Sequence, residues 1–119
     1  MTVKRIVANI ATQSIPERHR FYEELLGLKP VMDHGWIVTL ASDERAPVQV
    51  AFASEGGSGT PVPDLSIEVD DLDAVLARAE AMGLALAYGP VDEPWGVRRF
   101  FVRDPDGLLL NILTHADAT

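Results

Sequence analysis

Apolar and polar positions alternate along the chain in a way that predicts two similar runs of strands and helices. Residues 3–11 alternate with the period of a strand. Ser14 and Glu17 follow with the spacing of a capping box, so we expect a helix to begin there. That helix has one apolar stripe and should end at Gly27, which tolerates a left-handed conformation. Three short strands are expected after it, at residues 29–32, 36–40 and 48–52.

The same order of elements returns after a linker. Residues 54–63 are rich in Gly, Ser and Pro, and such a segment is expected to stay mobile because it has nothing to bury. A strand is expected at residues 65–69, and a helix capped by Asp70 or Asp71 should follow and stop at Gly83. Three further strands are expected at residues 86–88, 97–102 and 108–113.

This repeated order predicts one α+β domain made of two βαβββ modules. The modules span approximately residues 1–55 and 62–115, and the Gly/Ser/Pro linker joins them. A half of this size leaves one sheet face bare, which its copy can cover. We therefore expect the two halves to form a concave mixed sheet with room for a small molecule.

Composition excludes several classes of partner. The 119 residues include 18 acidic and 10 basic side chains, for a formal net charge of −8, and no cysteine. This charge repels phosphate backbones and anionic lipids and favours cationic ligands, so we expect neither nucleic acid nor a membrane as partner. No apolar run approaches the roughly 20 residues that cross a bilayer, and no signal peptide is recognisable. Without cysteine no disulfide can form, and the cytoplasm is the expected location.

Three short motifs stand in order along almost the whole chain. They are Phe21-Tyr22 with Leu26-Gly27-Leu28, then Val69-Asp70-Asp71-Leu72, then Asp104-Pro105-Asp106-Gly107. Together they resemble the glyoxalase, bleomycin-resistance and extradiol-dioxygenase superfamily, also called vicinal oxygen chelate proteins. That superfamily is built from paired βαβββ modules, so the resemblance implies the same fold as the hydrophobic pattern.

The resemblance also implies where a metal would bind. Metal-dependent members hold a divalent ion with residues from four strands, usually His or Gln and Glu. The matching positions here are Val7, Gln49, Asp64 and Asn111. Val7 has no donor atom, Asn111 replaces the usual carboxylate with a neutral amide, and only Asp64 carries charge. We therefore expect no metal and no other cofactor, unless an enzyme uses a divalent ion with an atypical ligand set.

A further stretch resembles the bleomycin-binding proteins, which dispense with metal. It begins at Glu93-Pro94-Trp95-Gly96 and continues through Arg98, Phe100 and Arg103. In those proteins the tryptophan of this motif helps to stack the drug, and two chains form the binding crevices at their interface. The resemblance thus implies that Trp95 stacks a small-molecule ligand and that the protein is a homodimer. An indole face can stack on planar heteroaromatics or hold a cation.

Other residues are weaker candidates for the same pocket. Trp36 holds an approximately corresponding position in the first half, where it either clamps the ligand or belongs to the core. His115 shares strand parity with Asn111 and would point into the concave face, whereas His19 and His34 do not look catalytic. No catalytic residue can be assigned. The expected ligand-binding residues are Trp95, Trp36, Asn111, Gln49, Asp64, Asn9 and His115.

Three functions are compatible with these observations. The first is a metal-free protein that sequesters a planar or cationic compound such as an antibiotic. The alternative is a metal-dependent lyase, isomerase or dioxygenase whose metal is held by Gln49, Asp64 and Asn111, with or without His115. The third is an accessory or regulatory module with a vestigial pocket.

Overall fold

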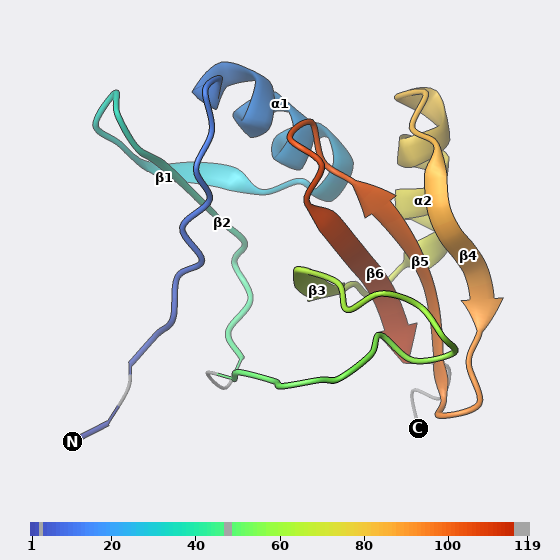
Figure 1. Ribbon diagram of the computed structural model, residues 1–119. Helices are drawn as coiled ribbons and strands as arrows, with labels where there is room; N and C mark the ends of the chain where they lie inside the picture. Colours follow the sequence, from blue (N-terminus) through green and yellow to red (C-terminus); the bar gives the residue numbers. More distant parts are fainter. Residues whose placement is uncertain (3, 47–48, 116–119) are drawn as a thin grey trace.

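The computed structural model describes residues 1–2, 4–46 and 49–115, and its elements confirm the expected α+β class (Figure 1). The first half contains α1 (Ile15–Leu26), β1 (Lys29–Asp33) and β2 (Val38–Ala41). The second half contains β3 (Leu65–Glu68), α2 (Leu72–Ala81), β4 (Leu86–Asp92), β5 (Val97–Arg103) and β6 (Leu109–His115). Neither helix in these ranges has the length and apolar character needed to cross a bilayer.

The second half forms the βαβββ module that its sequence predicts. Its four strands lie in the order β3-β6-β5-β4, with β3 parallel to β6 and the other two pairs antiparallel. The Asp71 side chain caps α2 by accepting a hydrogen bond from the Ala74 amide at 3.1 Å. Gly83 follows the helix in the left-handed region, at φ 72°, as expected of the residue that stops it.

Helices α1 and α2 cover one face of this four-stranded sheet. Because side chains alternate along a strand, every second residue of β5 and β6 reaches the helices. Four of these residues are at most 1% exposed, and each buried side chain of this kind stabilises the fold by roughly 1.5–3 kcal/mol: Phe100, Val102, Leu110 and Ile112. They pack against Phe21, Tyr22 and Leu25 of α1 and Leu72, Val75 and Ala79 of α2. Figure 1 shows α2 behind the sheet, so the face toward the viewer is free of helices.

Helix α1 begins and ends where the sequence predicts. The Ser14 side chain accepts a hydrogen bond from the Glu17 amide at 3.4 Å. Gly27 adopts φ 70°, and its amide donates to the Glu23 carbonyl at 2.9 Å. Local chemistry is sufficient at both ends, because each cap joins residues three or four positions apart.

The predictions of two strands in the first half are wrong for the residues that the structure describes. Residues 4–11 and 49–52 are not strands, while residues 3 and 48 lie outside the described part of the chain. β1 and β2 pair only with each other, in a sheet separate from the four-stranded one. Alternation permits a strand, but a ladder also needs the free N–H and C=O groups of a neighbouring strand. The first half is therefore a helix and a hairpin here, and the expected joint sheet is replaced by two separate sheets.

The linker prediction also needs correction, because the glycine-rich segment is bonded to the sheet. We call residues 55–61 the glycine loop. Within it, the Gly56 amide donates to the Thr60 carbonyl at 2.8 Å, and the Thr60 amide donates to the Gly57 carbonyl at 3.0 Å. Thr60 is buried. In Figure 1 this green segment passes in front of the four-stranded sheet, on the side away from α2. Composition alone cannot report such partners, since they lie far away in sequence.

Candidate functional site

The sheet face away from the helices carries polar and aromatic side chains. We call it the open face, although the glycine loop covers part of it. The strand register aligns one row across all four strands: Tyr88, Phe101, Asn111 and Ser66. A neighbouring row comprises Val91, Arg99, Leu113 and Glu68. Both rows face away from Phe100, which packs under the helices, because paired residues share a face and successive residues alternate.

A buried ion pair lies on the open face, at the end of the sheet next to the β4–β5 turn. Arg99 and Glu93 have side chains that are only 4% and 3% exposed, and Nε and Nη2 of Arg99 both lie 2.7 Å from Oε2 of Glu93. Glu93 also accepts hydrogen bonds from the Ser58 hydroxyl at 2.8 Å and the Tyr88 hydroxyl at 3.0 Å. Burial by itself raises the pKa of Glu93, but the hydrogen bonds from Ser58, Arg99 and Tyr88 outweigh it and leave the pKa below its usual value. Glu93 is therefore ionised at neutral pH.

Arg99 uses its remaining donors to hold the glycine loop. Nη1 donates to the Gly56 carbonyl at 2.9 Å, and Nη2 donates to the Gly57 carbonyl at 3.2 Å. The guanidinium carbon also lies 5.4 Å from the ring centroid of Tyr88 and 4.7 Å from that of Phe101. One side chain thus fastens a loop, a carboxylate and two rings together.

Trp95 lies in the turn between β4 and β5 and rests on the same arginine. The turn is closed by hydrogen bonds from the Glu93 amide to the Val97 carbonyl at 2.7 Å and from the Gly96 amide to the Glu93 carbonyl at 3.1 Å. The Arg99 guanidinium carbon lies 5.1 Å from the centroid of the indole. A Cβ on Gly57 would come within 2.7 Å of the indole, so the loop can approach only because that residue is glycine. Trp95 is nevertheless 51% exposed, so an oriented aromatic surface remains available.

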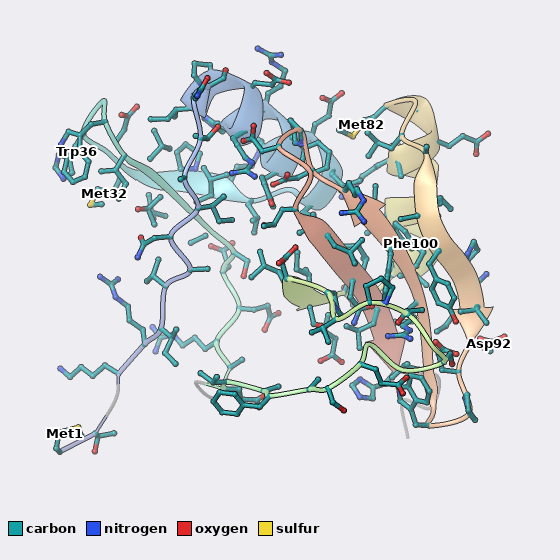
Figure 2. The ribbon with its side chains drawn as sticks, viewed as in Figure 1. Met1, Met32, Trp36, Met82, Asp92 and Phe100 are labelled. Carbon is teal, nitrogen blue, oxygen red and sulfur yellow. The ribbon has the colours of Figure 1, made fainter. Side chains whose placement is uncertain are left out.

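Trp36 lies elsewhere in the molecule. It is 78% exposed and stacks on His34, with ring centroids 6.5 Å apart and an interplanar angle of 18°. Figure 2 shows it with Met32 at the outer end of the β1–β2 hairpin. Because its side chain is exposed, Trp36 does not belong to the core. Among the described residues of one chain, no ring contact joins it to Trp95.

Asn111 is the amide that the structure brings onto the open face. It is buried, and its Nδ2 donates to the Ser66 hydroxyl at 3.0 Å. Its Oδ1 is buried without a hydrogen-bond partner. A buried acceptor left without a partner costs free energy, so this oxygen is a place where a donor from a ligand or water would be stabilised.

The other expected pocket residues have different surroundings. Asp64 accepts a hydrogen bond from the Leu109 amide at 2.8 Å and so fastens the start of β3 to β6. His115 is exposed on β6 and pairs through Nδ1 with Glu68 at 2.7 Å. Gln49 and Asn9 are exposed and lie in segments without secondary structure. The structure therefore gathers Trp95, Asn111 and His115 on or beside the open face, and it does not show Gln49 or Asn9 there.

Sequence comparison places this fold in a known group. A sequence model of the Glyoxalase/Bleomycin resistance protein/Dioxygenase superfamily matches residues 3–112. The chain belongs to this superfamily. Among proteins with curated descriptions, none matches the chain.

Solved structures of similar fold include proteins with and without an assigned role. The antibiotic binding protein TnmS3 from Streptomyces sp. CB03234 is 25% identical, with a TM-score of 0.66 over 97% of this chain and 96% of that one. A protein of unknown function from Agrobacterium tumefaciens is 24% identical, with a TM-score of 0.68 over 96% of each chain. A superfamily member from Sphaerobacter thermophilus is 22% identical, with a TM-score of 0.62 over 97% and 98%. The last two likenesses concern the fold alone.

The metal positions implied by the superfamily do not fit a divalent ion in this chain. Val7 is an exposed apolar side chain, the Asp64 carboxylate is bonded to a backbone amide, and Asn111 offers a single neutral oxygen. Within the described ranges, no three His, Cys, Asp or Glu side chains lie close enough together to hold a metal ion. A divalent ion needs several charged or imidazole ligands, which this set does not supply.

Sequence reasoning missed the residues that build the centre of the site. Arg99, Phe101, Tyr88 and Ser66 were not among its candidates, and Glu93 entered only as part of a motif. Strand parity could have identified two of them, because Arg99 and Phe101 alternate with the apolar Phe100 and Val102 along β5. The pairing of Arg99 with Glu93 had no such signal, since both residues could equally have been solvated.

Proposed function

We propose that the protein binds a small planar compound on its open face and sequesters it without a metal, in the manner of the antibiotic-binding members of its superfamily. The observation that carries the proposal is the half-exposed indole of Trp95, fixed in orientation by Arg99 and Gly57. The fold likeness to TnmS3, which binds an antibiotic, supports the same role.

The geometry favours stacking for a physical reason. A free indole samples several rotamers, and binding would have to restrict them at a cost in entropy. Trp95 is already restricted by the guanidinium and by the glycine loop, so little rotamer entropy is left to lose. A planar ring stacked on it gains roughly 0.5–1.5 kcal/mol beyond the area that is buried.

Charge favours a ligand with a cationic group. The buried pair of Arg99 and Glu93 has no net charge, so the surrounding acidic residues dominate the field at this end of the sheet. At the same end, a hollow of about 320 Å³ on the helix side of the sheet is lined by Arg98, Thr114 and His115 and by four acidic residues: Asp70, Asp71, Asp73 and Asp92. With a net charge of −8, such a surface raises the local concentration of cations.

The two tryptophans allow a direct test. The Trp36→Phe variant leaves Trp95 as the only indole, and Trp95→Phe leaves only Trp36. Proflavine, a planar cation, should quench the first variant saturably at one equivalent per chain, whereas the second should show only weak, linear quenching. Choline, a cation without a ring system, and anthraquinone, a neutral planar compound, separate the contributions of charge and stacking. Equal quenching of both variants would overturn the proposal.

Metal independence has its own measurement. Elemental analysis of protein purified without chelator should find far less than one transition ion per chain, and EDTA should leave the affinity for proflavine unchanged. About one tightly bound ion per chain, lost together with binding on chelation, would instead support the metal-dependent alternative.

We also propose that the protein is a homodimer in solution. Four large apolar side chains of the first half are exposed in the single chain, and a partner chain could cover them: Val31, Trp36, Val50 and Phe52. Light scattering should give about twice the chain mass of 13.0 kDa. Phe52→Asp should shift the protein toward monomer, whereas Val62→Asp, at another exposed apolar position, should not.

A further inference from the structure

In the described part of the chain, the glycine loop is bonded to the sheet through side chains and not through a backbone ladder. Its backbone hydrogen bonds run within the loop, from the Gly56 amide to the Thr60 carbonyl and from the Thr60 amide to the Gly57 carbonyl. The bonds that reach the sheet involve the side chains of Arg99 and Glu93. The loop can therefore leave the sheet without breaking the ladder of any strand.

Three hydrogen bonds hold the loop down, and we call them the latch. Arg99 donates from Nη1 to the Gly56 carbonyl at 2.9 Å and from Nη2 to the Gly57 carbonyl at 3.2 Å. The Ser58 hydroxyl donates to Oε1 of Glu93 at 2.8 Å. The ion pair does not depend on the loop, since Nε of Arg99 bonds directly to Oε2 of Glu93 at 2.7 Å. Water that replaces a released loop can bond to the freed groups, so release costs less than leaving them dry.

The latched loop carries backbone strain at Ser58. Its φ is 52°, and it is the one non-glycine residue with positive φ in the described ranges. On either side of it, Gly57 and Gly59 also have positive φ, 86° and 76°, where glycine is at no disadvantage. A side chain in this left-handed region is disfavoured, so release would relax Ser58. Strain that opposes the latch brings the free energies of the latched and released positions closer together.

The segments on both sides of the loop can act as hinges. Residues 49–54 before it are exposed and contain no helix or strand, and Val62 after it is exposed as well. In Figure 1 the loop crosses in front of the four-stranded sheet, and the chain enters it from a stretch without secondary structure. Movement of a loop as a unit requires only a few such positions that absorb the change in backbone angles.

The latched loop restricts the indole of Trp95. Gly57 lies so close to the ring that a Cβ there would come within 2.7 Å of it. The Arg99 guanidinium, 5.1 Å from the centroid of the indole, is itself bonded to the loop. Release removes the first of these neighbours and loosens the second, so the indole regains rotamers. A ligand that stacks on the ordered indole therefore binds more tightly to the latched position.

We propose that the glycine loop is a strap with two positions, latched and released, and that a ligand on Trp95 favours the latched one. This inference rests on the function proposed above and adds the regulation of that site. Linkage makes the effect reciprocal: a ligand that prefers the latched position holds the strap closed by the factor by which latching improves its affinity.

Amide hydrogen exchange of the ligand-free protein measures the release. The Gly56 and Thr60 amides should exchange by local opening, faster than the amides of β5 and β6. Ser58→Ala removes one bond of the latch and should accelerate both loop amides about tenfold, as expected for a hydrogen bond to a charged group. Ser58→Gly should exchange more slowly than Ser58→Ala, because glycine accepts positive φ without strain. Ser54→Ala, at an exposed serine that makes none of the latch bonds, is the matched control and should leave the rates unchanged.

Proflavine provides the second arm, in the Trp36→Phe protein, where Trp95 is the only indole. At a free concentration 100 times its dissociation constant, it should slow exchange at Gly56 and Thr60 by at least tenfold. The limit is about 100-fold, for a ligand that binds only the latched position. The Gly27 amide, which caps α1, should keep its rate.

The outcomes separate the strap from the proposed function. Proflavine binding that leaves exchange of the loop amides unchanged would refute the strap and leave the function standing. Absence of proflavine binding would refute both. The strap is also refuted if Ser58→Ala and Ser54→Ala exchange alike, or if the loop amides open only when the whole domain unfolds.

Discussion

Two buried arginine–carboxylate pairs serve different purposes in this molecule. Arg18 of α1 bonds to Asp104 in the turn between β5 and β6, where Tyr22 and two backbone amides bond to the same carboxylate. Arg99 bonds to Glu93 on the open face, where the guanidinium also contacts the glycine loop and three aromatic rings. The first pair joins the two halves of the chain, while the second holds the walls of the candidate site. The same chemistry therefore supports the fold in one region and the candidate site in the other.

The largest expected effect is at the first pair. Asp104→Ala should lower the free energy of unfolding by about 3–5 kcal/mol, because Arg18 would remain buried without its partner. Urea denaturation of the variant and the parent protein measures this directly. Asp106→Ala is the matched control, since its carboxylate is 45% exposed and bonds to Arg18 only from the edge. It should cost less than about 1 kcal/mol. Comparable losses in both variants would contradict a special role for Asp104.

A smaller effect is expected at the second pair. Glu93→Ala should cost about 1–3 kcal/mol, because the glycine loop can swing away and let water reach Arg99. The loss should be local. Hydrogen exchange at the Gly56 and Thr60 amides should accelerate strongly, while exchange in α1 should change little. A uniform acceleration over the whole domain would show that this pair supports the fold as Asp104 does.

Lowering the pH should reduce the free energy of unfolding by less than either Asp104→Ala or Glu93→Ala does. Burial by itself raises the pKa of Asp104, but hydrogen bonds from Arg18, Leu108 and Tyr22 leave it below its usual value, as the partners of Glu93 do for that residue. A carboxyl with a lowered pKa in the folded state contributes its full stability above the unfolded-state pKa and loses it as the pH falls. The urea midpoint should therefore decline below about pH 4–5. Asp104→Asn and Glu93→Gln should each flatten the decline, and an unchanged slope in both would contradict this origin.

The smallest effect on stability is expected in the glycine loop. Gly57→Ala and Gly59→Ala both place a side chain at positive φ, 86° and 76°, at a cost of about 1 kcal/mol each. Only Gly57→Ala should also displace Trp95, because a Cβ on Gly59 meets no atom within 4 Å. In a Trp36→Phe background, the emission maximum and acrylamide quenching of Trp95 should change in the first variant and not in the second. Identical spectra would mean that Gly57 does not position the indole.

The fold was predictable where the signals are local. The caps at Ser14 and Asp71 and the left-handed Gly27 each involve residues within four positions of one another, and the structure has all three. The strands of the second half were also predicted in order, since each has neighbours that complete its ladder. The strand expected at residues 3–11 fails in its described part for the opposite reason, because alternation in sequence does not supply a partner strand.

The candidate site was predictable only in part. The motif around Trp95 drew attention to the correct turn, and strand parity placed Asn111 on the face where it lies. The sequence alone determined where the helices begin and end, how the second half is ordered, and which indole lies in the β4–β5 turn. The tertiary structure decided that Arg99 and Glu93 are buried together, that the glycine loop is fastened to the sheet, and that Trp36 is exposed. Burial and pairing depend on residues far apart in sequence, such as Gly56 and Arg99, which are 43 positions apart, and no local pattern encodes such a pairing.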